Sequence, residues 1–300
     1  LARGNIGEAS DIIAKSSNLP AVCGRVCPHE KQCEGACVLN KRNCGIRIGK
    51  LERFIADFDA EMGIYRTPLV RETKGKVAVI GAGPAGLTVA GDLAKHGFEV
   101  TIFEAQSEPG GVLMYGIPEF RLSKEVIRRE IRRIEQLGVS FRTSVLVGPD
   151  VTVDDLFNQG FDAIFIGTGT ALPKTLGIAG EGLPGVVQAI YFLSIVSLAR
   201  AGTVNHLEIP IHPGDRVAVI GARNVAMDAA RTALRLGAAK VTVIYRRTAN
   251  EMTALQSEYQ EALAEGVNFL WLASPIRFLE EKRKLAGLEY EKQLVDDAGK

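Results

Sequence analysis

Hydrophobic residues follow two different rhythms along the chain, and the change between them predicts its organisation. Up to about residue 70 they recur every three or four positions, as in 48–63, which is typical of helices that bury one face. From residue 76 onward they form short runs rich in β-branched residues, each followed by a glycine-rich turn and a new helical pattern. Strands that alternate with helices favour a mainly parallel sheet, so a helical region gives way to an α/β region.

The α/β region contains the same strand, turn and helix twice. KVAVI (76–80), GAGPAG and the helical pattern after it lead to a second strand, EVTIFE (99–104). RVAVI (216–220), GARNVA and another helical pattern lead in the same way to KVTVIYRR (240–247), about 140 residues later. This order is the beginning of a βαβ unit in both places.

The first glycine turn has the residues that dinucleotide binding requires. Gly81 permits a tight turn, Gly83 lets the backbone approach a pyrophosphate, and Gly86 lets the helix pack closely on the strand. The free N–H groups at the start of the helix attract phosphate. Glu104, at the end of the second strand, can accept hydrogen bonds from ribose hydroxyls. The plainer interpretation is a glycine-rich turn that only closes an α/β unit.

The second glycine turn departs from this pattern. Its third position is Ala226, which is tolerable because that position only has to pack, but its second position is Arg223. A side chain therefore stands where backbone should meet pyrophosphate. Arg223 either swings out and pairs with a phosphate or blocks the site.

The residues after the second strand of this unit favour NADP over NAD. Tyr245 aligns with Glu104, and Arg246 and Arg247 follow it. A carboxylate repels a 2′-phosphate, whereas a guanidinium holds it through two hydrogen bonds. The alternative is a pair of solvated surface arginines.

Composition narrows the class of protein without deciding it. The chain is 46% hydrophobic and 24% charged, as in an ordinary globular protein, and its net charge of +1 favours neither nucleic acid nor an anionic membrane surface. No apolar run reaches the roughly 18 residues of a membrane span, and we expect a cytoplasmic setting. The chain starts at Leu1 rather than Met, which we interpret as a fragment of a longer protein.

All five cysteines lie within residues 23–44 and predict a metal site there. They are Cys23, Cys27, Cys33, Cys37 and Cys44. An odd number and a cytoplasmic setting argue against disulfides, a structural zinc site usually shows closely paired C-x2-4-C units, and no C-x-x-C is present for a disulfide reductase. An iron–sulfur cluster held by thiolates is the remaining interpretation.

We therefore expect an α/β protein with an N-terminal helical iron–sulfur domain (1–70), followed by two tandem Rossmann-like dinucleotide-binding domains at 71–175 and 176–300.

These motifs together resemble the glutamate synthase small-subunit family. Its relatives include the large subunit of ferredoxin:NADP transhydrogenase, sulfide dehydrogenase and the N-terminal half of dihydropyrimidine dehydrogenase. PAVCGRVCP, QCEGACV, GAGPAGL, EPGGVLMYGIPEFRL and VAMDAARTALRLGA match the family in order, over residues 18–266. The resemblance implies FAD in 71–175, NADPH in 176–300 and two [4Fe–4S] clusters, with a return to the FAD domain beyond residue 300.

The resemblance also implies which residues hold these cofactors. Those expected around FAD are Gly81, Gly83, Pro84, Ala85, Gly86, Leu87, Glu104, Gly110, Gly111, Arg121 and Thr168. Those expected around NADPH are Gly221, Asn224, Val225, Arg246 and Arg247. Those expected to bind iron are Cys27, Cys33 and Glu52 at one cluster and Cys37 at the other, while Cys23 packs nearby and Cys44 is peripheral.

A ligand count limits what this chain can hold alone. Two four-ligand clusters need eight ligands, whereas five cysteines and Glu52 supply six at most. In the family an upstream segment supplies the missing cysteines, so residues 1–300 complete one cluster at best.

The function implied is electron transfer without a catalytic side chain. NADPH, flavin and [4Fe–4S] clusters would exchange electrons with a partner, such as a glutamate synthase large subunit or a ferredoxin-reducing subunit. The four histidines are scattered, and no nucleophile constellation is present. The alternative is a non-catalytic relay or assembly subunit that binds FAD but not NADPH.

Overall fold

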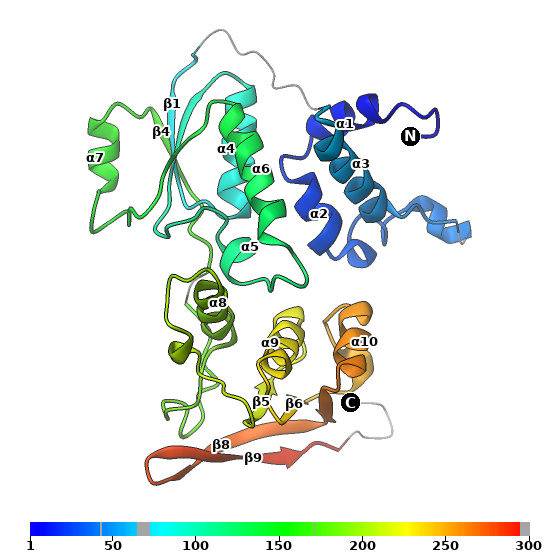
Figure 1. Ribbon diagram of the computed structural model, residues 1–300, viewed down its shortest axis with the longest axis vertical. Helices are drawn as coiled ribbons and strands as arrows, with labels where there is room; N and C mark the ends of the chain where they lie inside the picture. Colours follow the sequence, from blue (N-terminus) through cyan, green and yellow to red (C-terminus); the bar gives the residue numbers. More distant parts are fainter. Residues whose placement is uncertain (43, 65–72, 171, 295–300) are drawn as a thin grey trace. The chain divides into compact units, whose positions relative to one another are not determined.

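The computed structural model describes residues 1–42, 44–64, 73–170 and 172–294, which form two compact units. The first unit holds Leu1–Met114 and Glu119–Ala171, and the second holds Tyr115–Pro118 and Leu172–Lys300 (Figure 1). The domain boundary predicted at residue 70 lies outside the described residues. No helix in the described ranges is long and apolar enough to cross a membrane.

The first unit begins with helices. They are α1 (Ile6–Ala14), α2 (Pro20–Val26) and α3 (Ile48–Met62), with 3-10 turns at His29–Lys31 and Val38–Arg42. The helix predicted over 48–63 is confirmed, and it ends where Gly63 takes a left-handed φ of 61°. Helix α2 reaches into the cysteine stretch, where the sequence predicted a metal site but no particular helix. Its start depends on a distant residue, because the Ala21 N–H donates to the Glu130 carboxylate at 3.1 Å.

A four-stranded parallel sheet follows in the same unit, as the hydrophobic runs predicted. Its strands are β1 (Lys76–Ile80), β2 (Glu99–Phe103), β3 (Ser140–Arg142) and β4 (Ala163–Ile166), in the order β3-β2-β1-β4. Figure 1 shows α4 (Pro84–Lys95) and α6 (Lys124–Gln136) on one side of this sheet and α7 (Val153–Asn158) on the other. A one-turn helix, α5 (Val112–Tyr115), precedes α6.

The helical region is held against α4 and α6 by buried polar contacts. Arg133 of α6 pairs with Asp59 of α3 at 3.2 Å, and the Asp59 side chain is only 3% exposed. Asn18 donates to the Asp92 carboxylate of α4 at 2.6 Å. Glu130 of α6 is fully buried where it caps α2. Since buried polar groups are costly to leave without partners, these contacts fix the helical region to α4 and α6.

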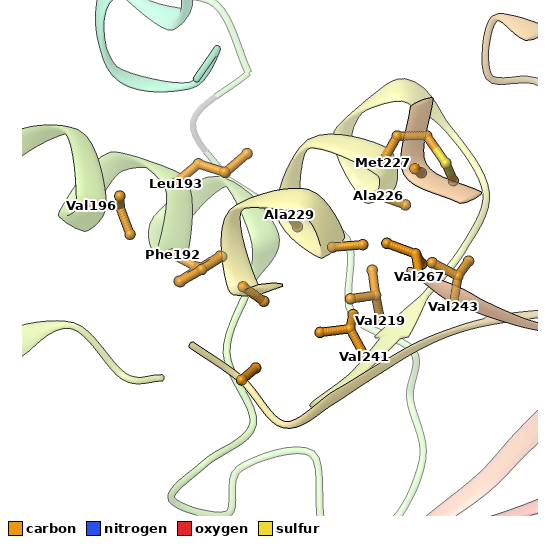
Figure 2. Close-up of a cluster of buried hydrophobic side chains, with 14 of the residues drawn as sticks. Phe192, Leu193, Val196, Val219, Ala226, Met227, Ala229, Val241, Val243 and Val267 are labelled. Carbon is orange, nitrogen blue, oxygen red and sulfur yellow. The ribbon is translucent and has the colours of Figure 1, made fainter. Parts of the chain in front are cut away.

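The second unit contains another parallel sheet. Its elements are α8 (Ala189–Arg200), β5 (Arg216–Ile220), α9 (Asn224–Arg235), β6 (Lys240–Tyr245), α10 (Gln256–Ala264) and β7 (Asn268–Trp271). The strands lie in the order β5-β6-β7, and an antiparallel hairpin of β8 (Ala273–Glu281) and β9 (Lys284–Lys292) follows. Figure 2 shows its core, where Phe192 of α8 and Met227 of α9 meet valines such as Val241. The repeat of strand, turn, helix and strand is therefore confirmed.

Candidate cofactor site

Three loops of the first unit converge where β1, β2 and β4 end. The Gly81 N–H donates to the Phe103 carbonyl at 2.8 Å, and the Gly167 N–H donates to the Ile80 carbonyl at 2.8 Å. The Gly110 N–H donates to the Ala82 carbonyl at 2.9 Å. The glycine turn is thus bonded to the segments that follow β2 and β4. The carboxyl edge of a parallel sheet is the usual place for a ligand in this type of fold.

The glycines of the first turn have three different surroundings. Gly81 has a φ of 98°, which L side chains rarely adopt. A Cβ on Gly86 would lie 1.9 Å from the Gly81 carbonyl oxygen, so helix α4 can approach the turn only without a side chain. A Cβ on Gly83 would meet nothing within 4 Å. The protein itself does not require glycine at 83, and the open space there fits an approaching pyrophosphate.

The start of α4 has the free donors that a phosphate needs. Gly83 is the N-cap of α4, so no N-cap side chain accepts hydrogen bonds from the first N–H groups of the helix. Pro84 occupies the first helical turn. Pro84 and Ala85 are exposed at this end. Leu87 is fully buried, so its side chain packs in the core and only its backbone belongs to the turn.

The segment after β2 lies directly against the glycine turn. A Cβ on Gly111, whose φ is 52°, would be 2.8 Å from the Cα of Gly83. Gly110 also has a positive φ, of 132°. Thr168 is exposed, and its Cα would be 3.3 Å from a Cβ on Gly81. The structure therefore brings together the predicted residues of all three loops, while Arg121 lies half-buried in the connection before α6.

Glu104 has a structural task that its position alone did not indicate. It is 7% exposed, and its two carboxylate oxygens accept hydrogen bonds from the Ala82 N–H at 2.7 Å and the Gln106 N–H at 2.8 Å. These bonds hold the glycine turn and the turn after β2 in place. Each carboxylate oxygen has a second lone pair with which it can accept a ribose hydroxyl.

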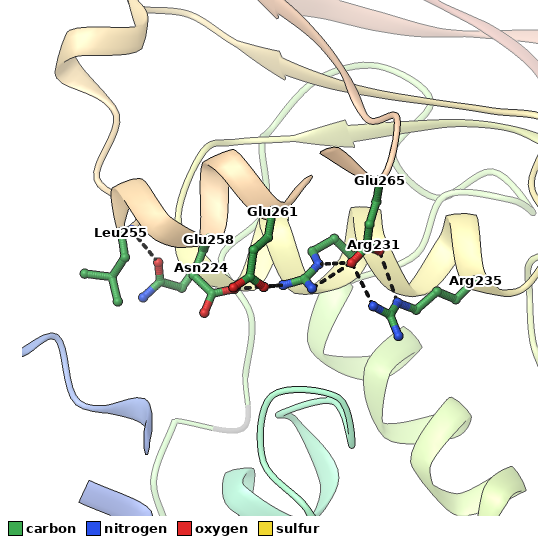
Figure 3. Close-up of polar contacts among 7 residues, drawn as sticks. All are labelled: Asn224, Arg231, Arg235, Leu255, Glu258, Glu261 and Glu265. Carbon is green, nitrogen blue, oxygen red and sulfur yellow. Dashed lines mark hydrogen bonds and ion pairs between the residues drawn. The ribbon is translucent and has the colours of Figure 1, made fainter. Parts of the chain in front are cut away.

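The second glycine turn is built in a similar way. The Gly221 N–H donates to the Ile244 carbonyl at 2.9 Å, and Gly221 has a φ of 109°. Ile244 pairs with Ile220 as Phe103 pairs with Ile80, which confirms the alignment of Tyr245 with Glu104. The Asn224 side-chain oxygen accepts a hydrogen bond from the Leu255 N–H at 2.9 Å, as Figure 3 shows. That carboxamide therefore anchors a loop within the unit.

The cationic residues at this edge are exposed. Arg223 is the N-cap of α9, and Arg246 and Arg247 follow β6. Arg247 lies 3.9 Å from a carboxylate oxygen of Glu251, an exposed pair that is worth little. Val225 is 37% exposed in the first turn of α9.

The cysteine region brings Cys27 close to Cys23 and near His29 and Glu52. A hydrogen bond from the Cys23 thiol, helped by the charge of His29, lowers the pKa of Cys27 to about 7. The same bond and partial burial hold the pKa of Cys23 well above its usual range. Burial raises the pKa of the Glu52 carboxyl, which accepts a weak hydrogen bond from the Ser17 hydroxyl at 3.5 Å. A thiolate at Cys27 is the form that binds iron.

The other predicted ligands lie apart from this pair. Cys33 and Cys44 are exposed, while backbone hydrogen bonds from Ile46 and Leu39 lower the pKa of Cys37. Among the residues that the structure describes, no three His, Cys, Asp or Glu side chains gather as metal ligands do. The donor types therefore fit a thiolate-bound cluster, but Cys33 and Cys37 are not gathered with Cys27 and Glu52.

One acidic residue in this stretch was not predicted and has a clear role. Glu34 is 9% exposed, and its carboxylate accepts a hydrogen bond from the Gly49 N–H at 3.0 Å. It thereby caps α3 from outside the helix. Gly49 also lies under the His29 ring, since a Cβ there would be 2.3 Å from the ring carbon Cε1. The spacing of Glu34 from α3 follows no capping pattern, so no local signal could have found it.

Residues 75–298 match the model of the pyridine nucleotide-disulphide oxidoreductase family. The chain belongs to this family. Residues 1–64 match a second family model, described as dihydropyrimidine dehydrogenase domain II, 4Fe-4S cluster. The α/β protein thus has a helical iron–sulfur-type region followed by a Rossmann-like FAD/NAD(P) domain. Residues 75–298 contain no cysteine, so the disulfide chemistry in the family's name has no thiol in the matched region.

Two similar proteins within the family indicate the kind of enzyme subunit that this chain resembles. The glutamate synthase [NADPH] small chain of Halomonas elongata is 40% identical over 94% of this chain and 60% of its own length. The NADP(+)-dependent formate dehydrogenase subunit beta of Moorella thermoacetica is 38% identical over 99% of this chain and 44% of its own length. This family member is therefore related to both. The sequence motifs predicted the first relationship, whereas the relationship to a formate dehydrogenase subunit was not predicted. The chain spans about half the length of such relatives.

A solved structure supports the fold. Mycobacterium tuberculosis FprA in complex with NADPH has a TM-score of 0.63 and 22% identity, over 76% of this chain and 65% of that one. At this identity the likeness concerns the fold alone.

Proposed function

We propose that this chain is the NADPH- and FAD-binding part of an oxidoreductase that passes electrons between NADPH, FAD and [4Fe–4S] clusters. The observation that carries the proposal is the first glycine turn, where an open space faces Gly83 and two further loops close around the turn. The family match over 75–298 supports the same cofactors.

In this proposal the first unit holds FAD. Gly81, Gly83 and Gly86 shape the turn, and the N–H groups at the start of α4 bind the pyrophosphate. Glu104 accepts the ribose hydroxyls, while Gly110, Gly111, Arg121 and Thr168 line the remaining sides. The side chain of Leu87 supports this site from the core.

The second unit holds NADPH as a second Rossmann-like domain. Gly221, Asn224 and Val225 form the turn and helix start, and Arg246 and Arg247 bind the 2′-phosphate. We keep the domain boundaries at 1–70, 71–175 and 176–300.

The helical region contributes to an iron–sulfur cluster. Cys27, Cys33 and Glu52 would be ligands of one cluster and Cys37 a ligand of the other, and the lowered pKa of Cys27 makes its thiolate more accessible. When bound, FAD would supply chemistry that couples two-electron hydride transfer from NADPH to one-electron transfer with iron–sulfur clusters. The chain's own part in this chemistry is to hold the groups in place, and the contacts of α2 and α3 with α4 and α6 do so.

A partner subunit completes the function. Relatives of this chain are named as a small chain of glutamate synthase and a beta subunit of formate dehydrogenase, and both names denote one subunit of a larger enzyme. A glutamate synthase large subunit or a ferredoxin-reducing subunit is the kind of partner we propose. The competing candidate is a relay subunit that binds FAD but not NADPH, in which the Arg223 side chain would block the second turn.

Anaerobic addition of NADPH to the full-length, FAD-loaded protein separates the two candidates. Rapid bleaching of the flavin absorbance supports the oxidoreductase. A spectrum that NADPH leaves unchanged, while dithionite bleaches it, supports the relay subunit.

A further inference from the structure

We propose that Arg223 is a specificity residue that binds the 2′-phosphate of NADPH together with Arg246. This inference rests on the proposed NADPH site in the second unit and concerns how that site chooses its cofactor. It assigns a function to the residue that breaks the glycine pattern.

The backbone at Arg223 has a conformation similar to that of the matching glycine of the first turn. Gly83 has φ −74° and ψ −177°, and Arg223 has φ −98° and ψ 171°. Both conformations are extended, which any residue adopts without strain. The arginine has therefore not distorted the turn, and only its side chain distinguishes the two places.

That side chain is exposed and unpaired at the carboxyl edge of the sheet. Among the described residues, Arg223 and Arg246 form no ion pair or hydrogen bond with a side chain, and Arg247 has only the exposed contact with Glu251. Strands β5 and β6 are neighbours, with Ile220 opposite Ile244, so the turn holding Arg223 and the segment holding Arg246 begin side by side. Uncompensated guanidinium groups on adjacent strand ends attract a doubly charged phosphate.

We assign Arg223 to the 2′-phosphate because its side chain removes a backbone contact with the pyrophosphate. A Cβ at this position keeps the backbone away from the pyrophosphate, which NADH and NADPH share. The contacts common to both cofactors are therefore weakened. Binding must therefore depend more on the 2′-phosphate, which only NADPH carries. Arg223 thus favours NADPH over NADH in two ways, because its charge attracts the 2′-phosphate and its Cβ weakens the contacts that both cofactors share.

Calorimetric titration of the full-length protein with NADPH, NADH and adenosine 2′,5′-bisphosphate tests this. Arg223→Met keeps the length of the side chain and removes its charge. It should therefore weaken the binding of NADPH and of the bisphosphate about tenfold or more and leave the affinity for NADH nearly unchanged. Arg223→Gly should also weaken NADPH relative to NADH, because it restores the approach to the pyrophosphate. Arg283→Met, in the exposed β8–β9 turn, is the matched control and should change none of these affinities.

The outcomes separate this inference from the function on which it rests. If the unaltered protein does not bind NADPH, the proposed function fails and the inference fails with it. If it binds NADPH but Arg223→Met leaves the NADPH and bisphosphate affinities unchanged, only the inference is overturned. Tighter NADPH binding in Arg223→Met would show that Arg223 obstructs the site.

Discussion

At the scale of single residues, glycines that look alike in the first turn are required for different reasons. Gly86 is required by the protein, because a Cβ there meets the Gly81 carbonyl oxygen at 1.9 Å. Gly83 is required only by a ligand, because a Cβ there meets nothing within 4 Å. The two positions can therefore be tested as a pair.

Gly86→Ala should lower stability by about 2–3 kcal/mol, since the helix and turn must separate to admit the methyl group. Gly83→Ala should leave the stability of the FAD-free protein unchanged within about 0.5 kcal/mol and weaken FAD binding about tenfold or more. Urea denaturation and flavin fluorescence titration measure the two effects. Equal FAD affinity in Gly83→Ala and the unaltered protein would remove the assignment of this turn to FAD.

Glu130 makes the attachment of the helical region sensitive to pH. Burial raises the pKa of its carboxyl from 4.5 to about 7, so the folded protein retains a proton that the unfolded chain releases. The stability that the protonated Glu130 carboxyl contributes is fully present below pH 4.5 and is lost as the pH rises through 7. Glu130→Gln should therefore be more stable than the unaltered protein at pH 8, by up to about 3 kcal/mol, and nearly equal to it at pH 4.5.

Denaturation of the cofactor-free protein at several pH values measures this difference. Glu135→Gln, an exposed position of α6, is the control and should show no such trend. A stability difference for Glu130→Gln that does not change with pH would contradict the assignment.

At the scale of elements, α9 and α10 are joined by one buried arginine. The Arg231 side chain is 5% exposed and pairs with Glu258 at 3.1 Å, Glu261 at 2.7 Å and Glu265 at 2.7 Å (Figure 3). Arg235 also pairs with Glu265 at 2.7 Å, but its side chain is 42% exposed. The Arg231 pairs with Glu258 and Glu265, whose side chains are 14% and 25% exposed, should carry most of the energy, because solvent screens the exposed Glu261 and Arg235.

Arg231→Met should destabilise the protein by about 2–4 kcal/mol, because it leaves three carboxylates without their shared partner. Arg235→Met, as a control of equal size and charge change, should cost less than about 1 kcal/mol. Urea denaturation followed by circular dichroism compares them. Similar losses in the two variants would mean that burial does not determine the strength of this network.

Most elements could be predicted from the sequence, because their signals are local. The strands at 76–80 and 216–220 are apolar runs bounded by glycine, and the helix at 48–63 has its own periodicity and terminal glycine. Helix α2, and the groups that cap α2 and α3, could not be predicted in the same way. Their caps come from Glu130 and Glu34, and the first of these is 109 residues away in the chain.

The candidate site was predictable to the same extent and for the same reason. The glycine turns are continuous motifs, whereas the bonds of Glu104 to Ala82 and Gln106 require the folded sheet. The contact of Gly111 with Gly83 likewise joins segments that are distant in sequence. The metal ligands stay a prediction, because Cys33 and Cys37 are not gathered with Cys27 among the described residues.

At the scale of the whole molecule, the central claim is that electrons pass from NADPH through FAD to iron in the protein that contains this chain. Low-temperature electron paramagnetic resonance of the anaerobic, full-length protein tests this claim most directly. NADPH should produce the signal of a reduced [4Fe–4S] cluster in FAD-replete protein and no signal in protein stripped of FAD. The account is contradicted if the protein holds no iron, or if NADPH reduces the iron equally well without FAD.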